Sequence, residues 1–174
     1  VSAKINLRTR RLTGTVRDIT GSRKTEEALI TSETRLRRAE LASRSGNWEL
    51  HLDSGTMIGS EGAMKLYGVK DFAAAYSMVR EVPLSEYREL MDQALNDLIK
   101  YNKPYDIEFK IRNRETGEII DIHSICEFDR ENRILFWVIQ DITARKRAEA
   151  EIIARSRNLS KLLELTMDLL ENSK

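Results

Sequence analysis

Apolar and polar residues alternate in short runs along much of the chain, and helical spacing fills the segments between those runs. Alternation is the period of a strand, and apolar residues three or four apart mark a helix. The alternating runs after residue 46 lie at 47–52, 56–60, 105–112, 118–128 and 133–141, and the helical segments at 22–44, within 61–79, at 85–102 and after 143. This order predicts an α+β domain with a five-stranded antiparallel sheet.

The last predicted strands are apolar on both of their faces. Leu135, Trp137 and Ile139 point one way, whereas Phe136 and Val138 point the other. An antiparallel sheet with one face in water would alternate apolar and polar residues cleanly. We therefore expect the domain's own helices to cover one face, and a flanking helix or a second subunit to cover the other.

The tripeptide Asp-Ile-Thr occurs twice, 123 residues apart, and the similarity continues beyond it. Each copy follows a strand-like run and opens a charged helical run. A strand-to-helix junction repeated at domain-length spacing predicts tandem modules. We expect residues 1–20 to be the end of a preceding module, 21–45 a linker helix, 46–143 a complete module and 144–174 a second linker helix. The candidate signal-relay residues are Asp18, Ile19, Thr20, Asp141, Ile142 and Thr143.

Both predicted linker helices carry an apolar stripe in the same phase relative to their Asp-Ile-Thr. Apolar residues that recur every seven positions, with a second set between them, are typical of a coiled-coil seam. In the second helix a charged residue, Arg155, interrupts the seam. We expect a homodimer that forms through the flanking helices at Leu29, Leu36, Ile152, Leu159, Leu162 and Leu169.

Charge is unevenly distributed, although the whole chain has a net charge of only +1. Residues 1–45 carry 11 Lys and Arg against 5 Asp and Glu, and residues 46–143 carry 11 against 18. An acidic central module argues against nucleic-acid binding. The single cysteine, Cys126, and the lack of a long apolar segment predict a cytoplasmic protein with no membrane insertion in this chain.

Four segments, taken in order, resemble the PAS sensor family with its C-terminal PAC segment. They are Gly46 to Leu50, MKLYGV at 64–69, PYDIEF at 104–109 and VIQDITARKRAE at 138–149. The resemblance implies helices across one face of the sheet, a pocket between sheet and helices, and helical linkers that dimerise in parallel. It also implies that Asp141 and Thr143 tie the strand exit to the outgoing helix. Thr143 could cap that helix, and Asp141 could accept backbone N–H groups at its start.

The pocket implied by the resemblance has several candidate lining residues, although aromatic and methionine side chains at such spacing more often form plain core. Haem-binding relatives place a ligand histidine on the long helix, whereas His51 and His123 lie in predicted strands. Cys126 also lies in a predicted strand and lacks the Asn-Cys-Arg motif of flavin-binding light sensors. We therefore expect no haem, flavin or metal, and leave open an unknown small ligand. The candidate lining residues are Trp48, Met64, Tyr67, Met78, Trp137 and Ile139.

No catalytic machinery is visible in the sequence. It has no phosphate-binding loop, no cyclase signature and no helical phospho-accepting histidine. The leading hypothesis is a sensory and dimerisation module that passes a signal along the chain to an output domain, in a two-component sensor histidine kinase. The alternative is a small-molecule or cofactor receptor domain of a cyclic-dinucleotide synthase or another output protein.

Overall fold

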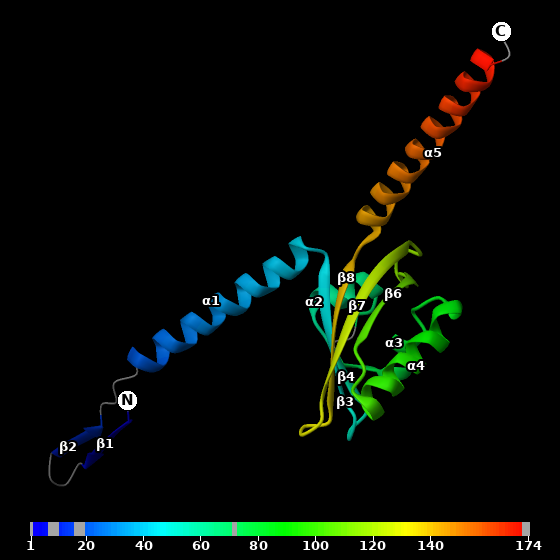
Figure 1. Ribbon diagram of the computed structural model, residues 1–174. Helices are drawn as coiled ribbons and strands as arrows, with labels where there is room; N and C mark the ends of the chain where they lie inside the picture. Colours follow the sequence, from blue (N-terminus) through cyan, green and yellow to red (C-terminus); the bar gives the residue numbers. More distant parts are fainter. Residues whose placement is uncertain (1, 7–10, 16–19, 71–72, 172–174) are drawn as a thin grey trace. The chain divides into compact units, whose positions relative to one another are not determined.

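The structure is a computed structural model that describes residues 2–6, 11–15, 20–70 and 73–171. The chain divides into two units, residues 1–39 and 40–174, and each is described by itself. In the first unit, strands β1 (Ser2–Asn6) and β2 (Arg11–Thr15) pair antiparallel (Figure 1). That they end a preceding module stays a prediction.

Helix α1 (Thr20–Ala42) begins at the threonine of the first Asp-Ile-Thr. Helix α5 (Thr143–Glu171) begins at the threonine of the second. Asp18 and Ile19 lie outside the described residues. The two copies therefore share the position at which a helix starts.

The second unit is built on one antiparallel sheet with the strand order β5-β4-β3-β8-β7-β6. Five of its strands are the predicted ones, with bounds that differ by no more than two residues. The sixth, β5, pairs with β4 at the edge and was not predicted, because its three alanines show no alternation. The strands are β3 (Ser45–His51), β4 (Thr56–Gly59), β5 (Ala73–Ala75), β6 (Tyr105–Arg112), β7 (Ile119–Asp129) and β8 (Ile134–Asp141).

Three helices lie on the same face of this sheet: α2 (Glu61–Tyr67), α3 (Tyr76–Arg80) and α4 (Ser85–Tyr101) (Figure 1). Helix α2 packs on β3, and α4 packs on β6 and β7. The hydroxyl of Ser60 accepts the N–H of Ala63 and so caps the start of α2. Glycine at position 46 allows close packing there, since a Cβ would lie 2.1 Å from the backbone nitrogen of Ala63.

Burial alternates along the strands as the sequence pattern predicts. Leu135, Trp137 and Ile139 of β8 face the helices and are buried. The opposite face carries four apolar side chains that are between 38% and 47% exposed: Ile58, Ile125, Phe136 and Val138. Both faces are therefore apolar, and the helices of the domain cover one of them. What covers the other face stays a prediction.

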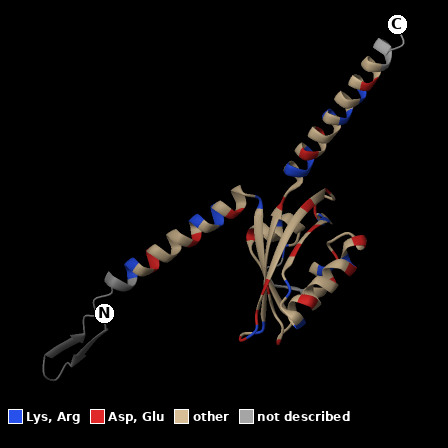
Figure 2. Cartoon of the chain, in the orientation of Figure 1, with Lys and Arg blue, Asp and Glu red and all other residues tan. Residues whose placement is uncertain are grey.

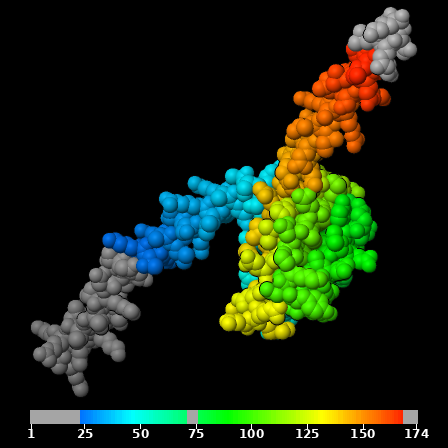
Figure 3. All heavy atoms as spheres, viewed as in Figure 1, coloured from blue at the N-terminus to red at the C-terminus, as the bar shows by residue number. Residues whose placement is uncertain are grey.

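Basic and acidic residues are interspersed along the described parts of α1 and α5 (Figure 2). In α5, every side chain from position 147 to 167 is exposed (Figure 3). Among the residues that the structure describes, every helix is too short or too polar to cross a bilayer.

Candidate functional site

Polar contacts gather at the point where β8 ends and α5 begins. The carboxylate of Asp141 accepts the backbone N–H of Thr143 at 2.8 Å. The N–H of Ile142 donates to the carbonyl of Asp121 on β7 at 2.8 Å, and the N–H of Asp121 donates to the Thr143 hydroxyl at 3.0 Å. We call this group of residues the exit junction; it consists of Arg44, Asp121, Asp141, Ile142 and Thr143.

The geometry corrects one expectation for Thr143. Its hydroxyl does not cap α5, because it accepts the N–H of Asp121 on β7. Thr143 is already the first helical residue, so its side chain faces back toward β7 rather than the helix start. The carboxylate of Asp141 receives a helical N–H, as predicted, and so partly satisfies the donors at the start of α5.

Arg44 links the end of α1 to the start of α5. It lies two residues after α1, and its Nε donates to Oδ2 of Asp141 at 2.7 Å. Its carbonyl also accepts the Asp141 N–H at 2.9 Å. Arg44 has a φ of 51°, in the left-handed region that favours glycine or asparagine. A strained residue that holds a buried partner is typical of a functional position.

Asp141 is charged in spite of its burial. Its side chain is only 4% exposed. Burial raises the pKa of this carboxyl, but the hydroxyl and N–H of Thr143 and the guanidinium of Arg44 outweigh burial and lower it. The exit junction therefore contains an ionised carboxylate, and its charge is stabilised by Arg44, just before β3, and by Thr143, at the start of α5.

A second set of ion pairs joins the first turn of α5 to the outer face of the sheet. Glu108 on β6 accepts Arg145 at 2.5 Å and also pairs with Lys146. Hydrogen bonds from Lys146 and Arg145 lower the pKa of Glu108 to about 2. Lys110 pairs with Asp121 at 2.5 Å on the same face. Strands β6 and β7 thus hold α5 through both backbone and side chains.

The last turn of α1 is anchored by a group that the sequence analysis missed. The carboxylate of Glu40 accepts the amide of Asn47 at 3.0 Å and the hydroxyl of Ser60 at 2.7 Å. Ser60 also accepts the backbone N–H of Asn47. Because Ser60 caps α2, the Glu40 anchor connects α1, β3 and α2. In the sequence, the only sign of this anchor is Ser60, because a serine just before a helical segment is typical of a helix cap.

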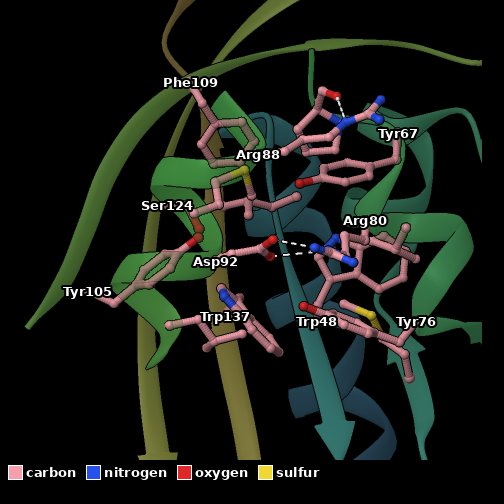
Figure 4. Close-up of a pocket in the computed structure, with 16 residues that line it drawn as sticks. Trp48, Tyr67, Tyr76, Arg80, Arg88, Asp92, Tyr105, Phe109, Ser124 and Trp137 are labelled. Carbon is pink, nitrogen blue, oxygen red and sulfur yellow. Dashed lines mark hydrogen bonds and ion pairs between the residues drawn. The ribbon is translucent and has the colours of Figure 1, made fainter. Parts of the chain in front are cut away.

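A small cavity lies between the sheet and helices α3 and α4 (Figure 4). Four of the six predicted lining residues meet there: Trp48, Tyr67, Trp137 and Ile139. Met64 is buried on α2 but lies outside the lining, and Met78 is 41% exposed. On α3 it is Val79 that faces inward, which leaves the preceding Met78 outside.

The cavity encloses about 50 Å³. Drug-sized ligand pockets typically measure roughly 300–1,000 Å³, so aromatic side chains fill most of this space. Trp48 meets Tyr67 edge to face, with ring centres 5.4 Å apart. The Trp48 indole nitrogen is buried without a hydrogen-bond partner among the described residues. Figure 4 shows the Arg80–Asp92 ion pair beside these rings, with Nε of Arg80 3.1 Å from Asp92.

The remaining titratable candidates lie elsewhere. His51 on β3 pairs with Glu49, and His123 on β7 pairs with Asp106, each at 2.6 Å. Cys126 is buried, and burial raises the pKa of its thiol to about 12, so it is protonated. Within the described part of the chain, no three His, Cys, Asp or Glu side chains are placed to hold a metal ion.

The predicted seam residues occupy exposed positions on the two flanking helices. Their side chains are between 58% and 69% exposed, and the Leu169 side chain lies outside the described part. Apolar residues left in water at coiled-coil spacing are available for a partner helix. The exposed seam residues are Leu29, Leu36, Ile152, Leu159 and Leu162.

No protein-family model and no curated protein matches the sequence, whereas solved structures do match the fold. A sensory box histidine kinase/response regulator from Burkholderia thailandensis superposes with a TM-score of 0.58 at 21% identity. The match covers 73% of this chain and 98% of that one.

Two further solved structures show the same similarity. An RNA-binding light-oxygen-voltage receptor has a TM-score of 0.52 at 19% identity, over 67% of this chain and 33% of that one. The N-terminal domain of a diguanylate cyclase with PAS/PAC sensor from Marinobacter aquaeolei has a TM-score of 0.50 at 11% identity, over 59% and 98%. The sheet order, the helices on one face and these superpositions show that the chain has the PAS fold.

Proposed function

We propose that this chain is a sensory and dimerisation PAS module that relays a signal through its flanking helices to an output domain. The observation that carries the proposal is the exit junction. There one buried carboxylate, Asp141, bonds both Arg44, two residues after α1, and Thr143, the first residue of α5. A change in the sheet that moves Asp141 would therefore act on both flanking helices.

The helices supply the second half of the relay. Their exposed apolar residues pair with those of a second copy, so that each junction acts on a two-helix rod. Two arrangements of such a rod, biased by the domain, would carry the signal. Proteins similar in fold include a histidine kinase and a diguanylate cyclase. We propose a cytoplasmic parent protein with a histidine kinase output, in which this segment itself carries out no catalytic step.

Light scattering tests the dimer directly. We expect the chain to have the mass of a dimer, and a double change, Ile152→Asp with Leu159→Asp, to make it monomeric. Ser160→Asp is the matched control, because Ser160 lies on the same helix outside the seam. A monomer at high concentration, or a dimer that survives the double change, would contradict the proposal.

A second candidate function, a small-molecule receptor, is favoured by one observation. The buried Trp48 nitrogen has no acceptor among the described residues, and a buried unpaired donor costs free energy. A small ligand with an acceptor atom could satisfy it if the aromatic residues moved apart. Native mass spectrometry of purified protein would test this, and a mass equal to that of the bare chain would argue against it.

A further inference from the structure

A second hollow lies outside the core, where the end of α1, helix α2 and the β6–β7 turn meet. We call it the junction cleft. It encloses about 430 Å³, within the roughly 300–1,000 Å³ typical of ligand pockets. Its lining includes Arg44, Lys65, Leu66, Glu115, Glu118 and Ile120.

The two sides of the junction cleft carry opposite charges. Arg44 and Lys65 come from the α1 end and α2, and Glu115 and Glu118 come from the β6–β7 turn. Within the described residues, the Lys65 ammonium and the Glu118 carboxylate have no ion-pair partner, whereas Glu115 meets Lys70 at 3.4 Å. Leu66 and Ile120 are buried residues that give the cleft an apolar part.

One buried side chain holds the two sides in place. The Asn113 amide donates to the carbonyls of Lys65 and Leu66, each at 2.9 Å. Its oxygen accepts the N–H groups of Glu115 and Thr116, also at 2.9 Å. Together the four bonds join α2 to the β6–β7 turn. The cleft is therefore preorganised, which reduces the entropy lost when a ligand binds.

We propose that the junction cleft binds a free amino acid with an aliphatic side chain. Its carboxylate would pair with Lys65 and Arg44, its ammonium with Glu118, and its side chain would contact Leu66 and Ile120. Lys65 and Glu118 are exposed, so a neutral apolar molecule would gain nothing from their charges, and a simple anion would meet the two carboxylates. A zwitterion can pair with the ammonium of Lys65 and with the carboxylate of Glu118 at the same time.

Arg44 belongs to both the junction cleft and the exit junction. A ligand carboxylate would compete with Asp141 for its guanidinium, so binding would alter the contact between the two flanking helices. This consequence rests on the proposed relay function, whereas binding itself does not. Light scattering therefore tests the proposed dimer, and ligand titration tests binding to the cleft, so that either proposal can be contradicted without the other.

Titration of the whole chain with leucine, followed by backbone NMR, tests the proposal. We expect shifts at Lys65, Glu118 and Ile120. We also expect binding about tenfold weaker for 4-methylpentanoic acid, which lacks the ammonium, and for 3-methylbutylamine, which lacks the carboxylate. Glycine should bind more weakly than leucine because it cannot use the apolar part of the cleft.

Two variants and a control complete the test. Lys65→Gln and Glu118→Gln should each weaken leucine binding about tenfold. Lys100→Gln should leave it unchanged, because Lys100 is an exposed residue in the last turn of α4 and lies outside the cleft lining. The absence of leucine binding, equal binding of either analogue, shifts confined to the inner cavity around Trp48, or affinity unchanged in both variants would each overturn the proposal.

Discussion

The inner cavity and the exit junction are held together by different forces. The cavity is closed by aromatic and aliphatic side chains that leave about 50 Å³ free. The exit junction is a set of directional bonds around Asp141. Hydrogen bonds from Thr143 and Arg44 keep its carboxylate charged. Dense packing resists small displacements, whereas a hydrogen-bond network can exchange one partner for another. We therefore expect the side chains around the cavity to contribute mainly to stability, and the exit junction to act mainly on the ends of α1 and α5 that it contacts.

Breaking the packing should give the largest effect. Trp48→Ala removes a side chain that is 1% exposed, and we expect a loss of about 3–5 kcal/mol in the free energy of unfolding. Chemical denaturation monitored by circular dichroism would measure it. Met78→Ala, at an exposed position, should change stability by less than about 0.5 kcal/mol. Similar losses for both variants would contradict the assignment of the cavity as core.

The buried strand residues around the cavity could be predicted from the sequence, because burial on one face of a strand requires an apolar residue at every second position. The strand positions of Trp48, Trp137 and Ile139 follow from alternation alone, and all three are buried around the cavity. Met78 was assigned to the same pocket by residue type. Its exposure depends on which side of the short helix α3 faces the sheet, and five residues are too few to show a period.

The polar part was predicted only where a motif marks it. Asp141 and Thr143 belong to the repeated tripeptide, so their position at the strand exit was expected. Arg44 and Glu40 were not, because each bonds a residue that is distant in sequence from it. The Arg44–Asp141 pair is 97 residues apart. A charged residue near a helix end is usually solvated, and only the fold shows the partner it meets.

Removing charge from the exit junction should have a smaller effect on stability and a clearer effect on the helices. Asp141→Asn keeps the shape and an oxygen for the Thr143 N–H, but it loses the ion pair with Arg44. We expect a loss of about 1–2 kcal/mol. We also expect faster hydrogen exchange in both the last turn of α1 and the first turn of α5. Glu131→Gln, in the exposed β7–β8 turn, is the control. Exchange that rises in neither helix would refute the shared junction.

A change at the Glu40 anchor should affect α1 without affecting α5, so that the two helices can be tested one at a time. Glu40→Gln keeps one acceptor oxygen near Asn47 and Ser60 but removes the charge, and we expect a loss of about 1 kcal/mol. Faster exchange should then appear in the last turn of α1 and not in α5, because the Glu40 carboxylate bonds β3 and the start of α2. Equal loosening of both helices would show that α1 and α5 are coupled by more than Arg44.

The ion pairs of Glu108 should give the smallest effect, and one that depends on pH. Because the folded-state pKa is about 2 and the ordinary value is 4.5, these pairs stabilise the fold above about pH 4.5. The contribution is lost as the pH falls from there toward 2. Glu108→Gln should therefore lower the melting temperature by about 2 °C at pH 7, since exposed pairs contribute little.

The difference between wild type and Glu108→Gln should shrink as the pH falls from 4.5 toward 3, because Glu108 then binds a proton in the unfolded chain while the folded protein keeps it ionised until about pH 2. Thermal unfolding at stepped pH values would measure it, with Glu131→Gln as the control on an exposed carboxylate. A difference that stays constant from pH 7 to pH 3 would mean that packing of the Glu108 side chain, rather than its charge, holds the first turn of α5 against the sheet.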